Sequence, residues 1–158
     1  MIVVMVAGGF DPIHSGHISH IREAAKLGDK IIVVTHPDSV LMGKKSFCFM
    51  PLNERIAILH ELLLGTSHEI RVSIDGNGQV AKTIELLKPD IFAKGGDRQA
   101  SNIPLEEIGA CNKVGCKVVY GVGKDKTVGS SPLFYSAVKQ LYENKPGRIK
   151  ELLGISGF

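Results

Sequence analysis

The chain of 158 residues has no tryptophan, few aromatic residues (6 %) and no long apolar run. Without tryptophan or a stripe of alternating aromatic and basic residues, it lacks the usual features of a nucleic-acid-binding protein. The apolar run Ile2–Ala7 is far too short to span a bilayer, and no basic segment precedes it as in a signal peptide. We therefore expect a cytoplasmic protein that binds neither nucleic acid nor a membrane.

Cysteine is also scarce, with only Cys48, Cys111 and Cys116. Three residues make a disulfide framework improbable, and no second Cys or His pair completes a zinc site, so we expect reduced thiols. Hydrophobic residues (44 %) and charged residues (22 %) are at ordinary globular levels, and the length predicts one domain over residues 1–158. The small net charge of +3 suits an anionic ligand.

Apolar segments of two kinds alternate along the chain. Continuous or alternating β-branched runs predict five strands, at Ile2–Ala7, Lys30–Thr35, Glu69–Ile74, Asp90–Lys94 and Lys117–Val122. Apolar residues at helical spacing predict helices between them, at Gly16–Gly28, Pro51–Gly65, Gln79–Lys88 and Ile103–Val114. A further helix is expected from Leu133 through Tyr142, after Ser130, Ser131 and Pro132, and one short helix within Pro146–Phe158.

This alternation predicts an α/β domain of the Rossmann-like type. Strands separated by helices form a doubly wound, parallel, five-stranded sheet with helices on both faces. The segment His36–Met50 shows no period and contains proline and glycine, so we expect it to be a loop. A ligand of such a sheet binds outside the carboxyl ends of the strands, which is where candidate site residues are sought.

Glycines and histidines follow the first predicted strand. Gly8 and Gly9 allow the backbone to approach a ligand closely, and the helix that starts near His14 presents free N–H groups to an anion. His14 and His17 are three residues apart and so share one face, from which both can donate to one polyphosphate. Each feature alone also occurs in ordinary turns and caps, so the prediction depends on their combination. His20 fits no motif and is expected to serve packing or to lie at the surface.

The segment Gly9–His17, GFDPIHSGH, resembles the H-x-G-H signature of the cytidylyltransferase-like nucleotidylyltransferases. The resemblance implies transfer of a nucleoside monophosphate from a triphosphate to a phosphorylated acceptor, with release of pyrophosphate. It implies that His14 and His17 contact the phosphates and stabilise the transition state, while Mg²⁺ accompanies the triphosphate. Residues of the same segment are expected to bind the nucleotide, namely Gly8, Gly9, Phe10 and Asp11.

A second segment, Leu87–Asp97, resembles the KPD…KGGD segment of heptose-1-phosphate adenylyltransferases. The resemblance implies that Lys94, Gly96 and Asp97 bind the nucleotide, with the backbone close to the base or ribose. Asp97 would accept hydrogen bonds from ribose hydroxyl groups. The alternative is a plain β-turn with a solvated aspartate.

A third segment, Thr127–Ser131, lies where the family carries a hydroxyl-rich run, although Gly129 replaces its first hydroxyl residue. Ser130 and Ser131 precede a predicted helix, so their hydroxyl and N–H groups are expected to bind phosphate. The alternative is an ordinary serine N-cap.

Four cationic side chains complete the predicted site. Lys44 and Lys45 follow the second strand, and the resemblance implies that they reach the triphosphate, Lys45 as a third catalytic residue. Arg55, at the start of a predicted helix, is expected to approach the substrate phosphate, and Arg98 to bind either substrate. Each of the four could instead be a solvated or ion-paired surface residue.

The sequence thus predicts an enzyme that transfers AMP from ATP to a sugar 1-phosphate such as heptose 1-phosphate. Alternatives are a CTP-dependent enzyme acting on glycerol 3-phosphate or another alcohol phosphate, a phosphopantetheine adenylyltransferase, and a nucleotide-binding regulator without turnover. Family relatives are often oligomers, and apolar residues near Phe134 and Tyr135 permit an interface, so we expect a homodimer.

Overall fold

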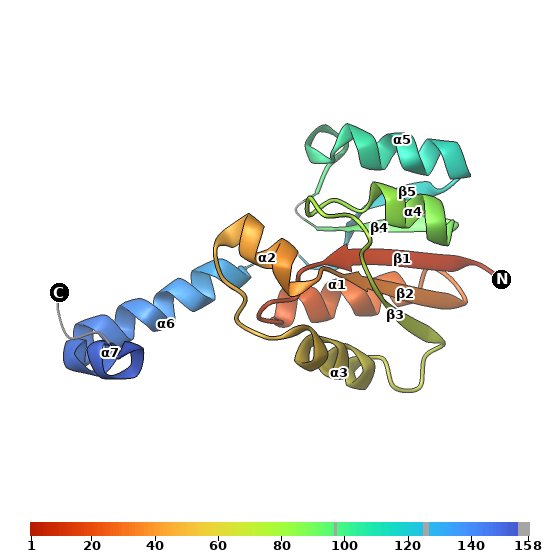
Figure 1. Ribbon diagram of the computed structural model, residues 1–158. Coiled ribbons are helices and arrows are strands. Elements are labelled where there is room, and N and C mark those ends of the chain that lie inside the picture. Colours follow the sequence, from red (N-terminus) through yellow and green to blue (C-terminus); the bar gives the residue numbers. More distant parts are fainter. Residues whose placement is uncertain (97, 125–126, 155–158) are drawn as a thin grey trace.

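The computed structural model describes residues 1–96, 98–124 and 127–154, and one parallel sheet forms its centre (Figure 1). The five strands have the order β3-β2-β1-β4-β5. Their bounds are Val3–Gly8 (β1), Lys30–Thr35 (β2), His68–Val72 (β3), Ile91–Gly95 (β4) and Lys117–Val122 (β5). The chain winds outward from β1 to β3 and then returns to the other side of β1. This reversal places the expected ligand crevice at the carboxyl end of β1.

Helices cover both faces of the sheet (Figure 1). Their bounds are Ser15–Ala25 (α1), Leu52–Leu62 (α3), Ala81–Leu87 (α4) and Leu105–Val114 (α5). Val4 and Val6 of β1 belong to the core that includes residues of α1 and α3, whereas Met5 between them belongs to the core that includes residues of α4 and α5. All three are completely buried, which is typical of a parallel strand covered on both sides. The predicted doubly wound α/β sheet is confirmed.

The prediction of a loop over His36–Met50 is wrong in part, because Asp38–Lys45 forms helix α2. Only two adjacent residues of this short helix, Val40 and Leu41, are buried, so no helical period is visible in the sequence. The charged residues of α2 were the signal from which this helix could have been predicted. An acidic residue stands in the first turn and two lysines in the last, which is the arrangement that the helix dipole favours.

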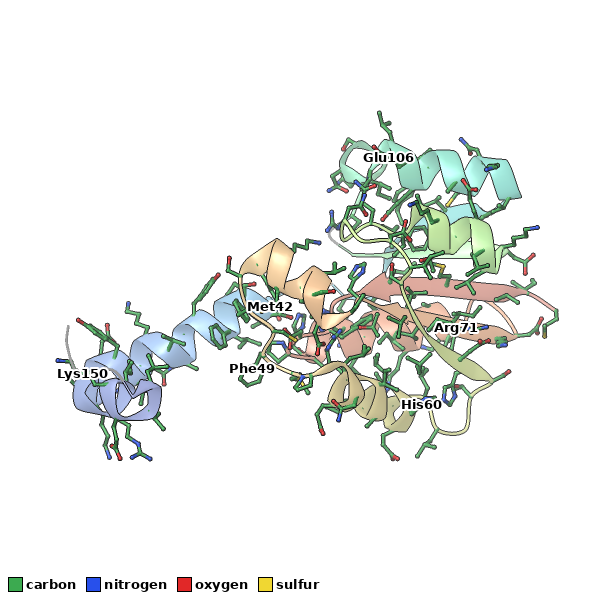
Figure 2. The ribbon with its side chains drawn as sticks, viewed as in Figure 1. Met42, Phe49, His60, Arg71, Glu106 and Lys150 are labelled. Carbon is green, nitrogen blue, oxygen red and sulfur yellow. The ribbon has the colours of Figure 1, made fainter. Side chains whose placement is uncertain are left out.

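Two C-terminal helices, α6 (Ser130–Asn144) and α7 (Pro146–Leu153), extend away from the sheet (Figure 1). α6 has no buried residue. Near its start the Phe134 ring stacks on Phe47, with centroids 4.1 Å apart. Phe49, which is labelled in Figure 2, contacts the Phe134 ring edge-on, with centroids 5.8 Å apart. The predicted helical tail is confirmed. Among the described helices, none has the length and apolar character needed to cross a membrane.

Arg55 of α3 joins the ends of two central strands from inside the protein. Its side chain is 0 % exposed. The guanidinium donates hydrogen bonds to groups that end strands or lie beside helix starts: Gly9 O (3.0 Å), Thr35 Oγ1 (2.7 Å), His36 O (2.8 Å), Asp38 Oδ1 (2.6 Å) and Met50 O (2.9 Å). The prediction that Arg55 binds substrate is therefore corrected, because a side chain without exposed surface does not meet a substrate phosphate in this structure.

Replacing Arg55 with methionine would leave the Asp38 carboxylate and three carbonyl groups without this donor. We expect Arg55→Met to lower the free energy of unfolding by about 3 kcal/mol or more, as is usual when one partner of a buried ionic cluster is removed. Urea denaturation followed by circular dichroism measures the change. Arg22→Met, on the exposed side of α1, is the matched control. Equal stability of the two variants would contradict this role of Arg55.

Candidate functional site

A cavity of about 750 Å³ opens at the carboxyl edge of the sheet. That size is typical of a site for a small-molecule ligand. Its walls come from the ends of β1 and β4, the start of α1, and the segments after β2, β3 and β4. The predicted site residues that line it are Gly8, Gly9, Phe10, His14, His17, Lys44, Lys94 and Arg98. The sequence motif and the cavity therefore coincide at the end of β1.

His14 and His17 cap the start of α1 reciprocally. His14 Nδ1 accepts a hydrogen bond from Gly16 N at 3.1 Å, and His17 Nδ1 accepts one from His14 N at 3.3 Å. A ring nitrogen that accepts a backbone N–H carries no proton, so each neutral imidazole has its proton on Nε2. The two rings stack with centroids 3.7 Å apart. The caps thus fix neighbouring imidazoles in one tautomer beside the N–H groups of a helix start, which suits an anionic ligand.

The Phe10 ring packs against His17 and lies so close to Gly8 that it leaves no room for a side chain there. Phe10 is buried, and its ring meets the His17 ring edge-on with centroids 5.1 Å apart. A Cβ on Gly8 would lie 3.1 Å from Phe10 Cζ, closer than a side chain normally packs. Phe10 itself has a φ of +52°, a left-handed conformation that residues other than glycine seldom adopt. Such strain is retained where the surrounding contacts specify it, often at functional sites.

Asp11 and Lys45 form an ion pair beside the cavity rather than in its wall. Lys45 Nζ lies 2.8 Å from Asp11 Oδ2. The Asp11 carboxylate also accepts hydrogen bonds from the backbone N–H groups of Phe49 (2.9 Å) and Met50 (2.5 Å). Burial raises the pKa of Asp11, but these hydrogen bonds outweigh it and leave the pKa below its ordinary value. Neither residue lines the cavity, so their evident role is to hold the segment before α3 against the loop after β1. Direct contact of Lys45 or Asp11 with a nucleotide stays a prediction.

Three other predicted cations line the cavity from different sides. Lys44 of α2 lies along Gly78, with its Nζ 3.8 Å from where a Cβ on that glycine would sit. Lys94 of β4 pairs with Glu107 of α5 at 3.0 Å. Arg98 is exposed after β4. Lys44 therefore brings positive charge to the α2 side and Arg98 to the β4 side, whereas Glu107, which also lines the cavity, balances the charge of Lys94.

The predicted nucleotide segment after β4 is only partly in the cavity wall. Lys94 and Gly95 line the cavity, whereas Gly96 does not. A Cβ on Gly96 would lie 3.1 Å from Lys124 O, so the absence of a side chain there serves packing against the segment after β5. Asp97 lies outside the described residues.

Ser130 and Ser131, predicted to precede a helix, are the first two residues of α6, and neither lines the cavity. Ser130 Oγ donates a hydrogen bond to Pro12 O at 2.8 Å, which ties the start of α6 to the loop after β1. A phosphate contact of either serine stays a prediction.

Sequence reasoning missed several cavity residues. His20, expected to serve packing or to lie at the surface, lines the cavity, and its Nδ1 lies 2.8 Å from Val122 O. Its position three residues after His17 on the same helix was a usable signal. Asn77 and Gln79 come from the segment after β3 and belong to no motif. Gln79 was predicted to begin a helix, which instead begins at Ala81.

His36 is a further cavity residue that no motif marks. It follows β2, is 4 % exposed, and its Nδ1 has no hydrogen-bond partner among the residues that the structure describes. Burial lowers the pKa of His36, and the charges of Lys44 and Arg55 lower it further, to about 4, although Asp75 opposes them. The imidazole is therefore neutral at neutral pH.

This burial predicts a loss of stability in weak acid. The unfolded His36 titrates near its ordinary pKa of 6.5 and the folded one at about 4, so between these values the unfolded state binds more protons. The contribution is complete above pH 6.5 and is lost as the pH falls to 4, by about 3 kcal/mol. Urea denaturation of the wild type and of His36→Met across this range measures it. Parallel stability curves for the two proteins would contradict the prediction.

Comparison with known sequences identifies related proteins. A family model described as Cytidylyltransferase-like matches residues 5–141. The FAD synthase of Thermoplasma volcanium is 34 % identical over 118 residues, which cover 75 % of this chain and 79 % of the relative. The bifunctional protein HldE of Hahella chejuensis is 31 % identical over 123 residues, which cover 77 % of this chain but only 23 % of that longer protein.

Solved structures agree with this relationship. The lipopolysaccharide core biosynthesis protein from Thermoplasma volcanium is 32 % identical, with a TM-score of 0.64 over 79 % of this chain and 99 % of that one. Pantoate-beta-alanine ligase from Francisella tularensis, 14 % identical with a TM-score of 0.55, shares the fold. The family match spans most of the chain, so the protein belongs to the cytidylyltransferase-like family of nucleotidyltransferases.

Proposed function

We propose that this protein transfers AMP from ATP to the phosphate of a sugar 1-phosphate such as heptose 1-phosphate. The observation that carries the proposal is the pair of imidazoles that capping fixes at the start of α1, inside a cavity with cations on two sides. Lys44 supplies positive charge from α2, and Arg98 supplies it from the β4 side. This set of groups binds and stabilises phosphates, and it matches the reaction class of the family.

The reaction requires positioning and charge stabilisation more than covalent catalysis. An oxygen of the acceptor phosphate, already ionised at neutral pH, attacks the α-phosphorus of ATP. The bond from the α-phosphorus to the bridging oxygen breaks, and pyrophosphate leaves with that electron pair. Nε2–H of His14 and of His17 would donate to the oxygens on which charge increases, together with backbone N–H groups of α1. Mg²⁺ enters with ATP as part of the substrate.

We place the nucleotide on the β4 side of the cavity. Lys94 and Arg98 line that side. Lys94 belongs to the segment Leu87–Asp97, whose sequence resembles heptose-1-phosphate adenylyltransferases, and Arg98 directly follows that segment. Glu107 holds Lys94 at the cavity wall through their 3.0 Å ion pair. The acceptor then approaches from the side of β2 and β3.

A second candidate acceptor is FMN, because the relatives include proteins named FAD synthase at 34 % identity. The cavity lining favours the sugar phosphate. Among the described residues that line it, Phe10 is the sole phenylalanine, tyrosine or tryptophan, and its ring already packs on Gly8 and His17. A flavin ring gains most of its binding free energy from flat apolar contact. Amide side chains such as Asn77 and Gln79 suit a hydroxyl-rich acceptor better.

His17→Ala tests the proposed transition-state contact. We expect turnover to fall by roughly 10²-fold with the fold retained, which is the usual loss when one transition-state donor is removed. Steady-state release of pyrophosphate measures turnover, and circular dichroism checks the fold. His60→Ala, at an exposed histidine of α3, is the matched control. Turnover of His17→Ala equal to that of the control would exclude His17 from the reaction.

The choice of substrates is tested by pyrophosphate release with MgATP, MgCTP, MgGTP and MgUTP. Each nucleotide is combined with heptose 1-phosphate, glycerol 3-phosphate, phosphopantetheine and FMN. We expect release with ATP and heptose 1-phosphate. Release with ATP and FMN would establish the second candidate, and release with CTP would contradict adenylyl transfer. Binding of nucleotide without release in any combination would support the regulatory alternative.

A further inference from the structure

His36 lies in the wall of the cavity, and the transfer step described above does not use it. The residue is 4 % exposed, and within the described part of the chain its buried Nδ1 has no hydrogen-bond partner. A buried nitrogen without a hydrogen-bond partner lowers the stability of the fold. An apolar side chain of similar size would fill the same space without this loss. The fold therefore does not require a histidine here, and a ligand is the natural partner for its ring.

The backbone of His36 is rigidly held. Its carbonyl oxygen accepts a hydrogen bond from Arg55 at 2.8 Å, and the same guanidinium donates to Thr35 Oγ1 at 2.7 Å. Moving His36 out of the cavity wall would disturb this buried cluster. A polar ring fixed in advance at a cavity wall loses little entropy when a ligand binds, so it can discriminate between ligands.

The cavity has two sides that meet at the start of α1. Lys94 and Arg98 line the β4 side, while His36, Lys44 and Gln79 line the side of β2 and β3. In-line transfer requires the acceptor and the leaving pyrophosphate to lie on opposite sides of the α-phosphorus. Because the proposed function places the nucleotide on the β4 side, His36 faces the acceptor.

The ring and its neighbour differ in what they can bind. The resemblance implies that Lys44 reaches the triphosphate, but its place on the side of β2 and β3 suits the acceptor phosphate instead, which its positive charge can bind. The imidazole of His36 is neutral at neutral pH, because burial and the nearby cations lower its pKa to about 4. A neutral imidazole offers one donor and one acceptor nitrogen, which a hydroxyl group satisfies in either direction.

We propose that His36 is a specificity-determining residue that hydrogen-bonds a hydroxyl group of the acceptor, beside the phosphate held by Lys44. This inference rests on the proposed function and names the substrate class of the same site, phosphorylated sugars and polyols. The ribityl phosphate of FMN shares that chemistry with heptose 1-phosphate, so both compounds are used as probes.

The first test is kinetic and uses His36→Leu and His36→Gln, with the acceptor varied at saturating MgATP and MgATP varied at saturating acceptor. With heptose 1-phosphate or FMN, whichever the wild type uses, His36→Leu should raise the acceptor KM about tenfold, as loss of one neutral hydrogen bond does. The KM for ATP should stay within about twofold. His36→Gln, which keeps a donor and an acceptor, should recover part of the loss. An unchanged acceptor KM, or a rise in the KM for ATP instead, would overturn the inference.

Two further readouts separate binding from folding and from turnover. His36→Leu should melt at the wild-type temperature or above, because an unpaired buried nitrogen is removed, and a lower melting temperature would assign His36 to the fold instead. Calorimetric titration with heptose 1-phosphate and with FMN should show binding that weakens about tenfold in His36→Leu and not in the surface variant His60→Leu. Such binding without pyrophosphate release would contradict the proposed function but support the inference. Equal binding by wild type and His36→Leu, or no binding of either probe, would overturn the inference.

Discussion

The buried guanidinium of Arg55 fixes the edge of the sheet on which the whole site is built. Its hydrogen bonds to Gly9 O and His36 O set where the chain leaves β1 and β2. From the first of these points the chain continues to Phe10 and the histidine caps, and from the second to α2 and Lys44. A buried charge with several partners is costly to disturb, so the geometry of the cavity is tied to the stability of the fold.

The histidine caps give the H-x-G-H segment a structural role in addition to its proposed chemical role. The hydrogen bonds that cap α1 use Nδ1 of His14 and of His17, and this choice leaves the proton of each neutral ring on Nε2. The Phe10 ring supports His17, and the missing side chain of Gly8 makes room for that ring. Folding of the loop thus prepares the imidazoles before any ligand arrives, which is the condition for effective electrostatic catalysis.

Much of the fold could be predicted from the sequence, because the apolar runs of the strands and the helical spacings are strong local signals. α2 was missed because two buried residues show no period. The cavity motif was found because His14 and His17 are close in sequence. The roles of the cationic side chains were harder to predict, because the sequence does not tell whether a side chain near a strand end points into a cavity or into the interior. Lys44 lines the cavity, whereas Lys45 pairs with Asp11 and Arg55 is buried. His36 belongs to no sequence motif, and its position in the cavity wall depends on the tertiary structure.

The hydrogen bonds that cap α1 fix His14 and His17 as neutral imidazoles with the proton on Nε2. Long-range ¹H–¹⁵N correlation spectra of the histidine rings in ¹⁵N-labelled protein, recorded above neutral pH, report this tautomer. Both rings should show an unprotonated Nδ1 and a protonated Nε2 before any ligand is added. A proton on Nδ1 of either ring, or shifts averaged between the two nitrogens, would contradict this tautomer assignment.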